Sequence, residues 1–176
     1  MIEINYQEKD LEDYLCKEKN FKKWFPNLKI VKRQFQIFDF FVDILAYDNL
    51  AKCFVIIELK KNELNANSFI QAIRYKNCLS KKYINQKFYI ILLGEKLNPE
   101  LFYCVNSYDT YRYSVIDTVY YYLYHYSFEE GINFHYINTT QQEIERRLEK
   151  IEIKSIAQRV KTIKEWRKYN GDIQEN

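Results

Sequence analysis

Glycine and proline are scarce in this sequence, which has three glycines and two prolines among 176 residues. Loops that cradle phosphate with backbone N–H groups need several closely spaced glycines, and the chain contains neither a P-loop nor a GxGxxG segment. The nucleophile signature GxSxG is also missing. These absences exclude P-loop and dinucleotide-binding proteins and the serine hydrolases that carry that signature.

Long apolar runs, paired cysteines and clustered histidines are also missing. No apolar run approaches the ~18 residues of a membrane span, and the N-terminus is acidic and amphipathic, unlike a signal peptide. The four cysteines form no CxxC pair, which argues against zinc and favours reduced, buried thiols. His125 and His135 have no other ligand at metal-binding spacing. We therefore expect a cytoplasmic protein with no membrane partner.

Charge and aromatic content give little guidance on function. The net charge of +3 and pI of about 8.5 are compatible with a nucleic-acid partner without arguing for one. The 17 tyrosines could stack on bases, but an AT-rich coding sequence produces the same excess of Tyr, Phe, Asn, Lys and Ile. We therefore treat the tyrosines as compositional bias.

The pattern of apolar residues predicts an alternation of helices and strands in the first 94 residues. Residues 6–25 have a helical spacing that ends at Pro26. An alternating segment predicts a strand at 29–37, and apolar runs rich in β-branched and aromatic residues predict strands at 38–48 and 53–60. The continuous apolar run 87–94 predicts a strand buried on both faces. Between them we expect a helix over 65–79, capped by Asn65 or Asn67. Its inward-facing side chains would be Phe69, Ile70, Ile73 and Cys78.

The second half of the chain is less regular. A short helix is expected near 98–105. Residues 112–137 fit either a hairpin or a helix over 117–127. Capping boxes at 140–143 and 155–158 predict C-terminal helices with a basic end. We expect an α/β fold with a mixed central sheet, formed by a main domain (1–138) and a basic helical extension (139–176) packed on it.

Two acidic residues and a lysine interrupt the apolar strands 38–48 and 53–60. If Asp48 and Cys53 flank a four-residue loop, Asp43 lies directly opposite Glu58, with about 4.5–5.5 Å between their Cβ atoms. Lys60 shares a face with Glu58, because strand side chains alternate. Burying such charges is costly unless a metal or hydrogen bonds satisfy them. The arrangement favours a divalent-metal site for phosphodiester chemistry over a salt-bridged surface.

The helix over 65–79 adds polar side chains to this constellation. Gln71 and Tyr75 are four residues apart, so they lie on one side of the helix, with Arg74 beside them. The ordered set of Asp43, Glu58-x-Lys60 and Gln71-x-x-x-Tyr75, preceded by an acidic helix, resembles the PD-(D/E)XK nuclease superfamily. The resemblance covers residues 8–95. Within the superfamily it is strongest to the catalytic domain of NucS-type mismatch and flap endonucleases and to the nuclease domain of YhcG-like proteins.

The resemblance implies a restriction-endonuclease-like fold, with a mixed central β-sheet of four core strands flanked by helices, and a nuclease that depends on Mg²⁺ or Mn²⁺. Asp43 and Glu58 would bind the metal, together with the carbonyl of Leu59. Lys60 would orient or deprotonate the attacking water, whereas Gln71 and Tyr75 would position the phosphate.

Further residues follow from the same resemblance. The acidic residue of the first helix corresponds best to Glu8, with Glu12 as its rival, and Arg74 and Lys61 are candidate nucleic-acid contacts. A glycine that the family has shortly before the aspartate is replaced by Phe40-Phe41.

The leading hypothesis is a DNA endonuclease. A homodimer would follow if it cuts both strands, because that requires two sites. One alternative is a nuclease-fold module that binds nucleic acid or a partner without cleaving, or only with a partner. The other is an RNA-cleaving enzyme, whose metal chemistry is the same.

Overall fold

The computed structural model describes residues 6–98, 101, 119–127 and 131–137. All elements described below lie in the compact unit formed by residues 1–139. The predicted helix near 98–105 lies almost entirely outside the described residues, and the predicted helices of 139–176 lie wholly outside them. Within the described part of the chain, no helix is long and apolar enough to cross a membrane.

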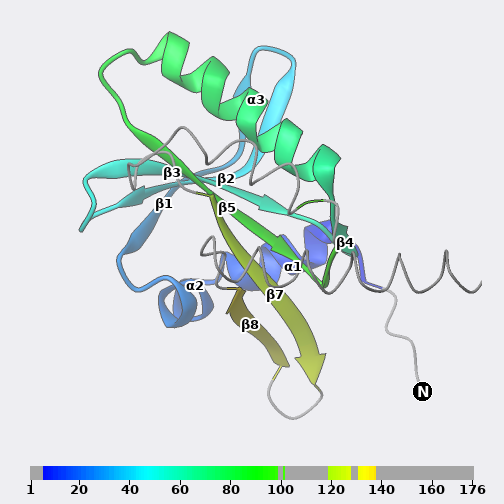
Figure 1. Cartoon of the computed structure of the whole chain (residues 1–176). Helices are drawn as coiled ribbons and strands as arrows, with labels where there is room; N and C mark the ends of the chain where they lie inside the picture. Colours follow the sequence, from blue (N-terminus) through cyan, green and yellow to red (C-terminus); the bar gives the residue numbers. More distant parts are fainter. Residues whose placement is uncertain (1–5, 99–100, 102–118, 128–130, 138–176) are drawn as a thin grey trace, which may run out of the picture. The chain divides into compact units, whose positions relative to one another are not determined.

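Six strands form one mixed sheet in the order β1-β2-β3-β5-β7-β8 (Figure 1). They are β1 (Leu28–Ile37), β2 (Phe40–Asp48), β3 (Cys53–Leu59), β5 (Phe88–Gly94), β7 (Val119–Ser127) and β8 (Gly131–Ile137). The first three are antiparallel, β3, β5 and β7 are parallel, and β8 returns antiparallel to β7. β4 (Glu63–Leu64) and β6 (Lys96–Leu97) form a separate pair. The mixed sheet is confirmed, and 112–137 contains the hairpin.

Helices cover the two faces of this sheet (Figure 1). On one face lies α3 (Ala66–Lys82), whose N-cap Asn65 accepts a hydrogen bond from the Ser68 backbone N–H at 3.1 Å. Its buried stripe includes Phe69, Ala72 and Leu79. The prediction that Ile70 faces inward is wrong, because Ile70 lies one position off this stripe and is 53% exposed.

The other face is covered by α1 (Glu8–Leu15) and α2 (Glu18–Trp24). The prediction of one helix over 6–25 is therefore wrong. Leu11 and Leu15 are four residues apart, so they lie on the same face of a helix. The next core residue, Phe21, follows six residues after Leu15 and would lie on another face of one continuous helix. The chain turns at Lys17, which has an extended backbone (φ −62°, ψ 128°), so that Phe21 joins the same core.

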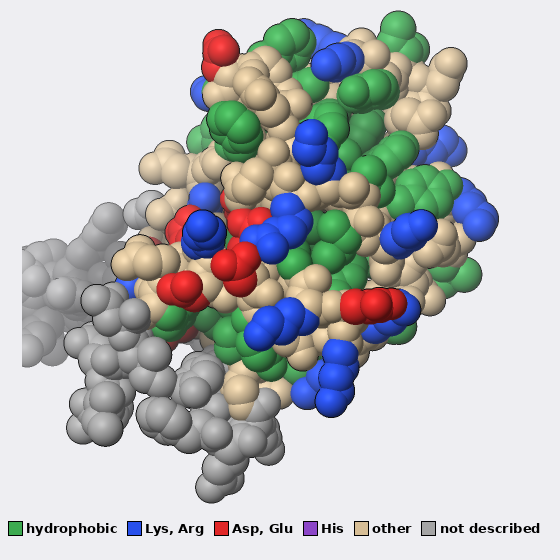
Figure 2. Space-filling view, turned by 180° about the vertical axis from the view of Figure 1, so that it is seen from behind, with side chains coloured by type: hydrophobic (Ala, Val, Ile, Leu, Met, Phe, Trp, Pro, Cys, Tyr) green, Lys and Arg blue, Asp and Glu red, His purple; other side chains and the backbone are tan. Residues whose placement is uncertain are grey.

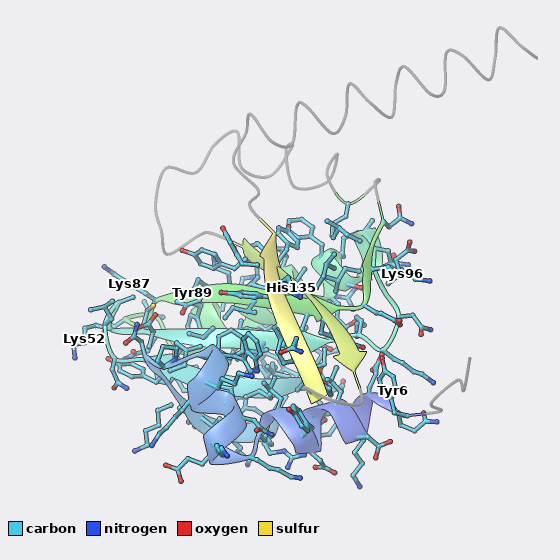
Figure 3. All side chains as sticks on the ribbon, turned by 90° about the horizontal axis from the view of Figure 1, so that it is seen from below. Tyr6, Lys52, Lys87, Tyr89, Lys96 and His135 are labelled. Atoms are coloured by element: carbon cyan, nitrogen blue, oxygen red, sulfur yellow. The ribbon has the colours of Figure 1, made fainter. Side chains whose placement is uncertain are left out.

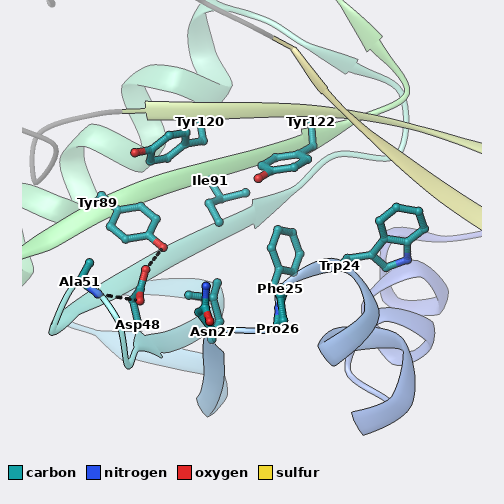
Figure 4. Close-up of a pocket in the computed structure, with 11 residues that line it drawn as sticks. Trp24, Phe25, Pro26, Asn27, Asp48, Ala51, Tyr89, Ile91, Tyr120 and Tyr122 are labelled. Atoms are coloured by element: carbon teal, nitrogen blue, oxygen red, sulfur yellow. Dashed lines mark hydrogen bonds between the residues drawn. The ribbon is translucent and has the colours of Figure 1, made fainter.

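The turn between β2 and β3 lies at one end of the sheet. There the buried Asp48 accepts a hydrogen bond from the backbone N–H group of Leu50 at 2.8 Å. It also accepts one from the Ala51 backbone N–H at 2.9 Å and one from the Tyr89 hydroxyl at 2.8 Å (Figure 4). Tyr89 also lines an aromatic cavity of about 200 Å³. In Figure 3, Tyr6 and Tyr89 lie at opposite ends of the described part of the chain.

Candidate active site

The candidate site lies at the end of the β2–β3 hairpin that is remote from the turn. The paired residues run from Asp48↔Cys53 to Ile44↔Ile57, which confirms the predicted register. Beyond the last pair, the Asp43 carboxylate accepts a hydrogen bond from the Leu59 backbone N–H at 2.8 Å. Burial raises the pKa of the Glu58 carboxyl, and Glu58 lies close enough to Asp43 for the charge of Asp43 to raise that pKa further. The two carboxylates are thus held together where the strands part.

Glu58 is fully buried and incompletely satisfied. Its Oε2 atom lies 3.4 Å from the Gln71 amide nitrogen and 4.0 Å from the Lys60 ammonium, whereas Oε1 is buried and has no hydrogen-bond partner among the described residues. Burial, and then the charge of Asp43, raise the pKa of the Glu58 carboxyl well above its ordinary value of 4.5. A buried oxygen without a partner is rare and costly. It points to a positively charged ligand at this position.

Asp43 is half-buried and accepts hydrogen bonds from two elements. Besides Leu59, the Gln34 side-chain amide donates to Asp43 Oδ1 at 3.3 Å. Burial raises the pKa of the Asp43 carboxyl, and the hydrogen bond from Leu59 and the charge of Lys60 oppose that rise. Asp43 therefore has one oxygen fixed by the β3 backbone and the other oriented by a neutral side chain.

The donor chemistry fits a hard divalent cation. Carboxylate and carbonyl oxygens are the ligands that Mg²⁺ takes, and Mg²⁺ keeps several waters in its shell. Among the described residues, no three His, Cys, Asp or Glu side chains cluster as a metal site. A cation here would be held by Asp43, Glu58 and a backbone carbonyl such as that of Leu59, with water completing the shell.

Gln71 and Tyr75 of α3 lie together beside Glu58, as their spacing predicts. The Gln71 side-chain amide donates to the Tyr75 hydroxyl at 2.6 Å and approaches Glu58 with the same nitrogen. Tyr75 is buried against Phe40, with 5.7 Å between the ring centroids, and burial raises the pKa of its phenol. Tyr75 therefore fixes Gln71, which is the group next to the carboxylates. Arg74 is exposed and lies over the Phe40 ring.

The two acidic candidates of α1 have different surroundings. Glu12 is buried and accepts hydrogen bonds from Arg33 at 2.6 Å and from Gln34 at 2.7 Å. Glu8 is exposed and accepts one from the Lys61 backbone N–H at 3.1 Å. Both line a cavity of about 620 Å³ that Asp43 and Leu59 also border. Glu12 is thus held by the Arg33 ion pair, whereas Glu8 is exposed beside the same cavity.

Tyr124 and Tyr6 support the site and are not singled out by the sequence analysis. The Tyr124 hydroxyl lies 2.9 Å from the Lys60 carbonyl and 2.7 Å from the Lys61 carbonyl, and the Tyr6 hydroxyl donates to it at 3.0 Å. A phenol has one proton, so it donates to one of those carbonyls at a time. The two tyrosines hold the chain that carries Lys60. Their only signal was the tyrosine-rich composition, which we treated as bias.

Acidic side chains gather on the face shown in Figure 2, with lysine and arginine side chains beside them. Lys61 contributes its backbone N–H to Glu8, and its ammonium lies 5.5 Å from the centre of the Tyr6 ring. The site therefore combines a pair of carboxylates with neighbouring cations, which is the charge pattern required to bind a cation and a phosphate together.

Comparisons with known proteins identify a family and a shared fold. Residues 7–108, more than half of the chain, match the family model described as the endonuclease NucS C-terminal domain. A solved repair endonuclease from Pyrococcus abyssi is 19% identical, with a TM-score of 0.50, over 61% of this chain and 46% of its own. Its fold is therefore shared. No curated protein matches the chain.

Two other solved structures match with TM-scores below 0.5. The EndoMS–dsDNA complex is 20% identical over 60% of this chain and 43% of its own, with a TM-score of 0.49. SfsA of Pyrococcus furiosus in complex with Ca²⁺ is 14% identical over 73% of this chain and 63% of its own, with a TM-score of 0.45. The similarity thus spans less than half the length of the Pyrococcus abyssi repair endonuclease and of the EndoMS chain.

Proposed function

Because the chain belongs to the endonuclease NucS C-terminal domain family, we propose that it is a DNA endonuclease that hydrolyses phosphodiester bonds with Mg²⁺ or Mn²⁺. The observation that carries the proposal is the Glu58 carboxylate, buried with one oxygen unpartnered and adjacent to Asp43. A purely structural carboxylate at this depth would be fully hydrogen-bonded.

In the proposed reaction, Asp43 and Glu58 would hold the cation together with the Leu59 carbonyl. Bound Mg²⁺ supplies a Lewis acid that lowers the pKa of water and neutralises charge on the phosphate. Lys60, whose Nζ lies 4.0 Å from Glu58, would orient the attacking water and stabilise negative charge in the transition state as an ammonium, or would deprotonate that water as a neutral amine. Gln71, fixed by Tyr75, directs its amide at the phosphate. Glu8 completes the site from α1, and Arg74 and Lys61 contact the nucleic-acid backbone.

The substrate and assembly follow from the family and the chemistry. Two relatives are described as a repair endonuclease and as a complex with double-stranded DNA, which favours DNA over RNA. Cutting both strands requires two sites, so a homodimer is part of the proposal. Cys16, Cys53 and Cys78 are free thiols, and burial raises the pKa of Cys16 to about 11, which suits the reducing cytoplasm.

Cleavage assays test this function directly. The wild type would be compared with Asp43→Ala on labelled single-stranded, duplex, flapped and mismatched DNA and on RNA, with Mg²⁺, Mn²⁺ or EDTA. We expect metal-dependent cleavage of DNA by the wild type and a loss of at least about 10²-fold in Asp43→Ala. Undiminished cleavage by Asp43→Ala would contradict the proposal. Cleavage of RNA but not of DNA would identify the protein as a ribonuclease instead.

A further inference from the structure

We propose that the aromatic cavity beside the β2–β3 turn binds a quaternary ammonium group, carried either by a small molecule or by a trimethylated lysine side chain. Four aromatic rings would surround the cation, and the Asp48 carboxylate would balance its charge. The cavity lies at the opposite end of the hairpin from Glu58, so the inference goes beyond the proposed function and does not rest on it.

The walls of the aromatic cavity are rings from three separate segments of the chain. Phe25, which follows α2, packs edge-to-face on Tyr122 of β7, with 5.4 Å between the ring centroids. Tyr89 of β5 packs in the same way on Tyr120 of β7, at 5.3 Å. In Figure 4 these four rings lie around the side chain of Ile91. Protein interiors contain few voids larger than a water molecule, so an unfilled volume of about 200 Å³ among these rings is room for a small ligand group.

A negative charge lies in the wall of the aromatic cavity. Asp48 lines the cavity, is only 9% exposed, and accepts the hydrogen bond from the Tyr89 hydroxyl that Figure 4 shows. Burial, and then the hydrogen bond to Asp48 and the charge of that carboxylate, raise the pKa of the Tyr89 phenol. Among the residues that the structure describes, no lysine, arginine or histidine lines the cavity. The cavity therefore combines electron-rich ring faces with an anion, and both attract a cation.

The hydrogen bonds of Asp48 determine which kind of cation fits. Its two oxygens already accept three hydrogen bonds, from the backbone N–H groups of Leu50 and Ala51 and from Tyr89, out of about four that a carboxylate can accept. A primary ammonium or a guanidinium would therefore leave N–H donors without acceptors in this cavity. A metal ion needs oxygen ligands that are not already engaged. A quaternary ammonium has no N–H group, so it binds through ring faces and charge alone.

The aromatic cavity is accessible from solvent. Pro26, Asn27 and Ala51 line it and are exposed, whereas Phe25 and Tyr89 are buried. A ligand can therefore reach the rings without unfolding the core, and the chain that carries the ammonium group can extend past the exposed residues. This geometry accommodates the end of a long side chain as well as a small molecule.

Ligand-observed NMR titrations of the full chain in EDTA test the inference. The probes are choline, the neutral analogue of choline in which a tert-butyl group replaces trimethylammonium, and a peptide with one lysine, trimethylated or unmodified. Salt at about 0.15 M screens the exposed Lys52 and Lys87, which Figure 3 shows at the same end of the described part of the chain as Tyr89. We expect choline to bind at least about tenfold more tightly than its neutral analogue, because only choline carries the charge. Tighter binding of the trimethylated peptide, without binding of the unmodified one, would identify a protein side chain as the source of the ammonium group, and binding of choline alone would identify a small molecule.

Variants of the cavity wall separate binding from folding. Tyr122→Leu removes one ring but keeps an apolar side chain, and Asp48→Asn removes the charge, so each should raise the Kd for choline about tenfold. Tyr122→Phe keeps the ring face and should bind choline nearly as the wild type does. Tyr83→Leu replaces a tyrosine that is 39% exposed and lies outside the cavity, so it is the matched control and should leave the Kd unchanged. Glu58→Gln should also leave it unchanged, and the Tm of each variant shows that it is folded during the titration.

Equal affinity of the wild type for choline and for its neutral analogue would overturn the inference, because the cavity would then be apolar without selecting a cation. So would an unchanged Kd for choline in Tyr122→Leu and Asp48→Asn, or the absence of binding of both choline and the trimethylated peptide. A wild type that binds choline but never cleaves DNA with Mg²⁺ or Mn²⁺ would instead contradict the proposed function alone.

Discussion

The hairpin formed by β2 and β3 has a buried acidic residue at each end, Asp48 beside the turn and Glu58 at the open end. Asp48 accepts two backbone hydrogen bonds and one from Tyr89, so both of its oxygens are partnered. Glu58 is buried more deeply, has one oxygen without a partner, and lies next to a second carboxylate. Two buried carboxylates on adjacent strands thus differ in hydrogen bonding. Both oxygens of Asp48 are hydrogen-bonded, whereas one oxygen of Glu58 has no partner among the described residues.

Under the proposed function, the two acidic residues of this hairpin have different roles: Asp48 stabilises the fold, and Glu58 binds the ligand. Asp48 closes the turn and fixes the register, so its hydrogen bonds contribute to folding. Glu58 costs folding free energy, because burial and the charge of Asp43 both disfavour its ionised form. Under the proposed function, a bound cation would offset this cost. Variants at the two ends should therefore have opposite effects.

The largest effect is expected from Glu58→Gln. This change keeps the shape of the side chain and removes the negative charge that would bind the cation. Metal-dependent cleavage of DNA should fall by about 10²–10³-fold or more, while the Tm measured without metal stays the same or rises. Activity close to that of the wild type, or a large fall in Tm, would remove the distinction between the two ends.

Asp48→Asn should give the reverse pattern. The amide cannot accept all three hydrogen bonds as the carboxylate does, so the free energy of unfolding should fall by about 1–3 kcal/mol. Chemical denaturation measures this change, and cleavage by the fraction that remains folded should be nearly unaffected. A loss of cleavage comparable to that of Glu58→Gln would show that the turn also takes part in catalysis.

The pH dependence of stability should sharpen the comparison. Without metal, unfolded Glu58 releases its proton near its ordinary pKa, whereas folded Glu58 keeps it to higher pH. Between the ordinary pKa of about 4.5 and the higher pKa of folded Glu58, the folded state binds more protons than the unfolded state. The free energy of unfolding should therefore decrease as pH rises above about 4.5, by up to about 1.4 kcal/mol per pH unit. Glu58→Gln should flatten this decrease. An unchanged slope in that variant would assign the effect to other groups.

The smallest effect is expected from Tyr124→Phe. The variant keeps the ring and removes the hydroxyl that contacts the Lys60 and Lys61 carbonyls. Because Lys60 would then be held less firmly, kcat should fall about threefold to tenfold, with no change in metal affinity. Tyr120→Phe, on the same strand, is a matched control and should leave kcat unchanged.

The sequence predicted the parts of the site that depend on local pattern. A polar link between two apolar runs determines the β2–β3 register, and helical spacing places Gln71 beside Tyr75. The contacts of Tyr124 with Lys60 and of Gln34 with Asp43 could not be predicted, because they require the order of strands in the sheet. The single helix over 6–25 was wrong because burial of Phe21 outweighs continuation of the helix at Lys17.

Titration calorimetry with Mn²⁺ is the most direct test of the central claim, that Asp43 and Glu58 bind a divalent cation. The wild type and Asp48→Asn should each bind about one Mn²⁺ per chain with similar affinity, and Glu58→Gln should show no binding in the same range. Absence of Mn²⁺ binding by the wild type, or equal binding by Glu58→Gln, would contradict the claim.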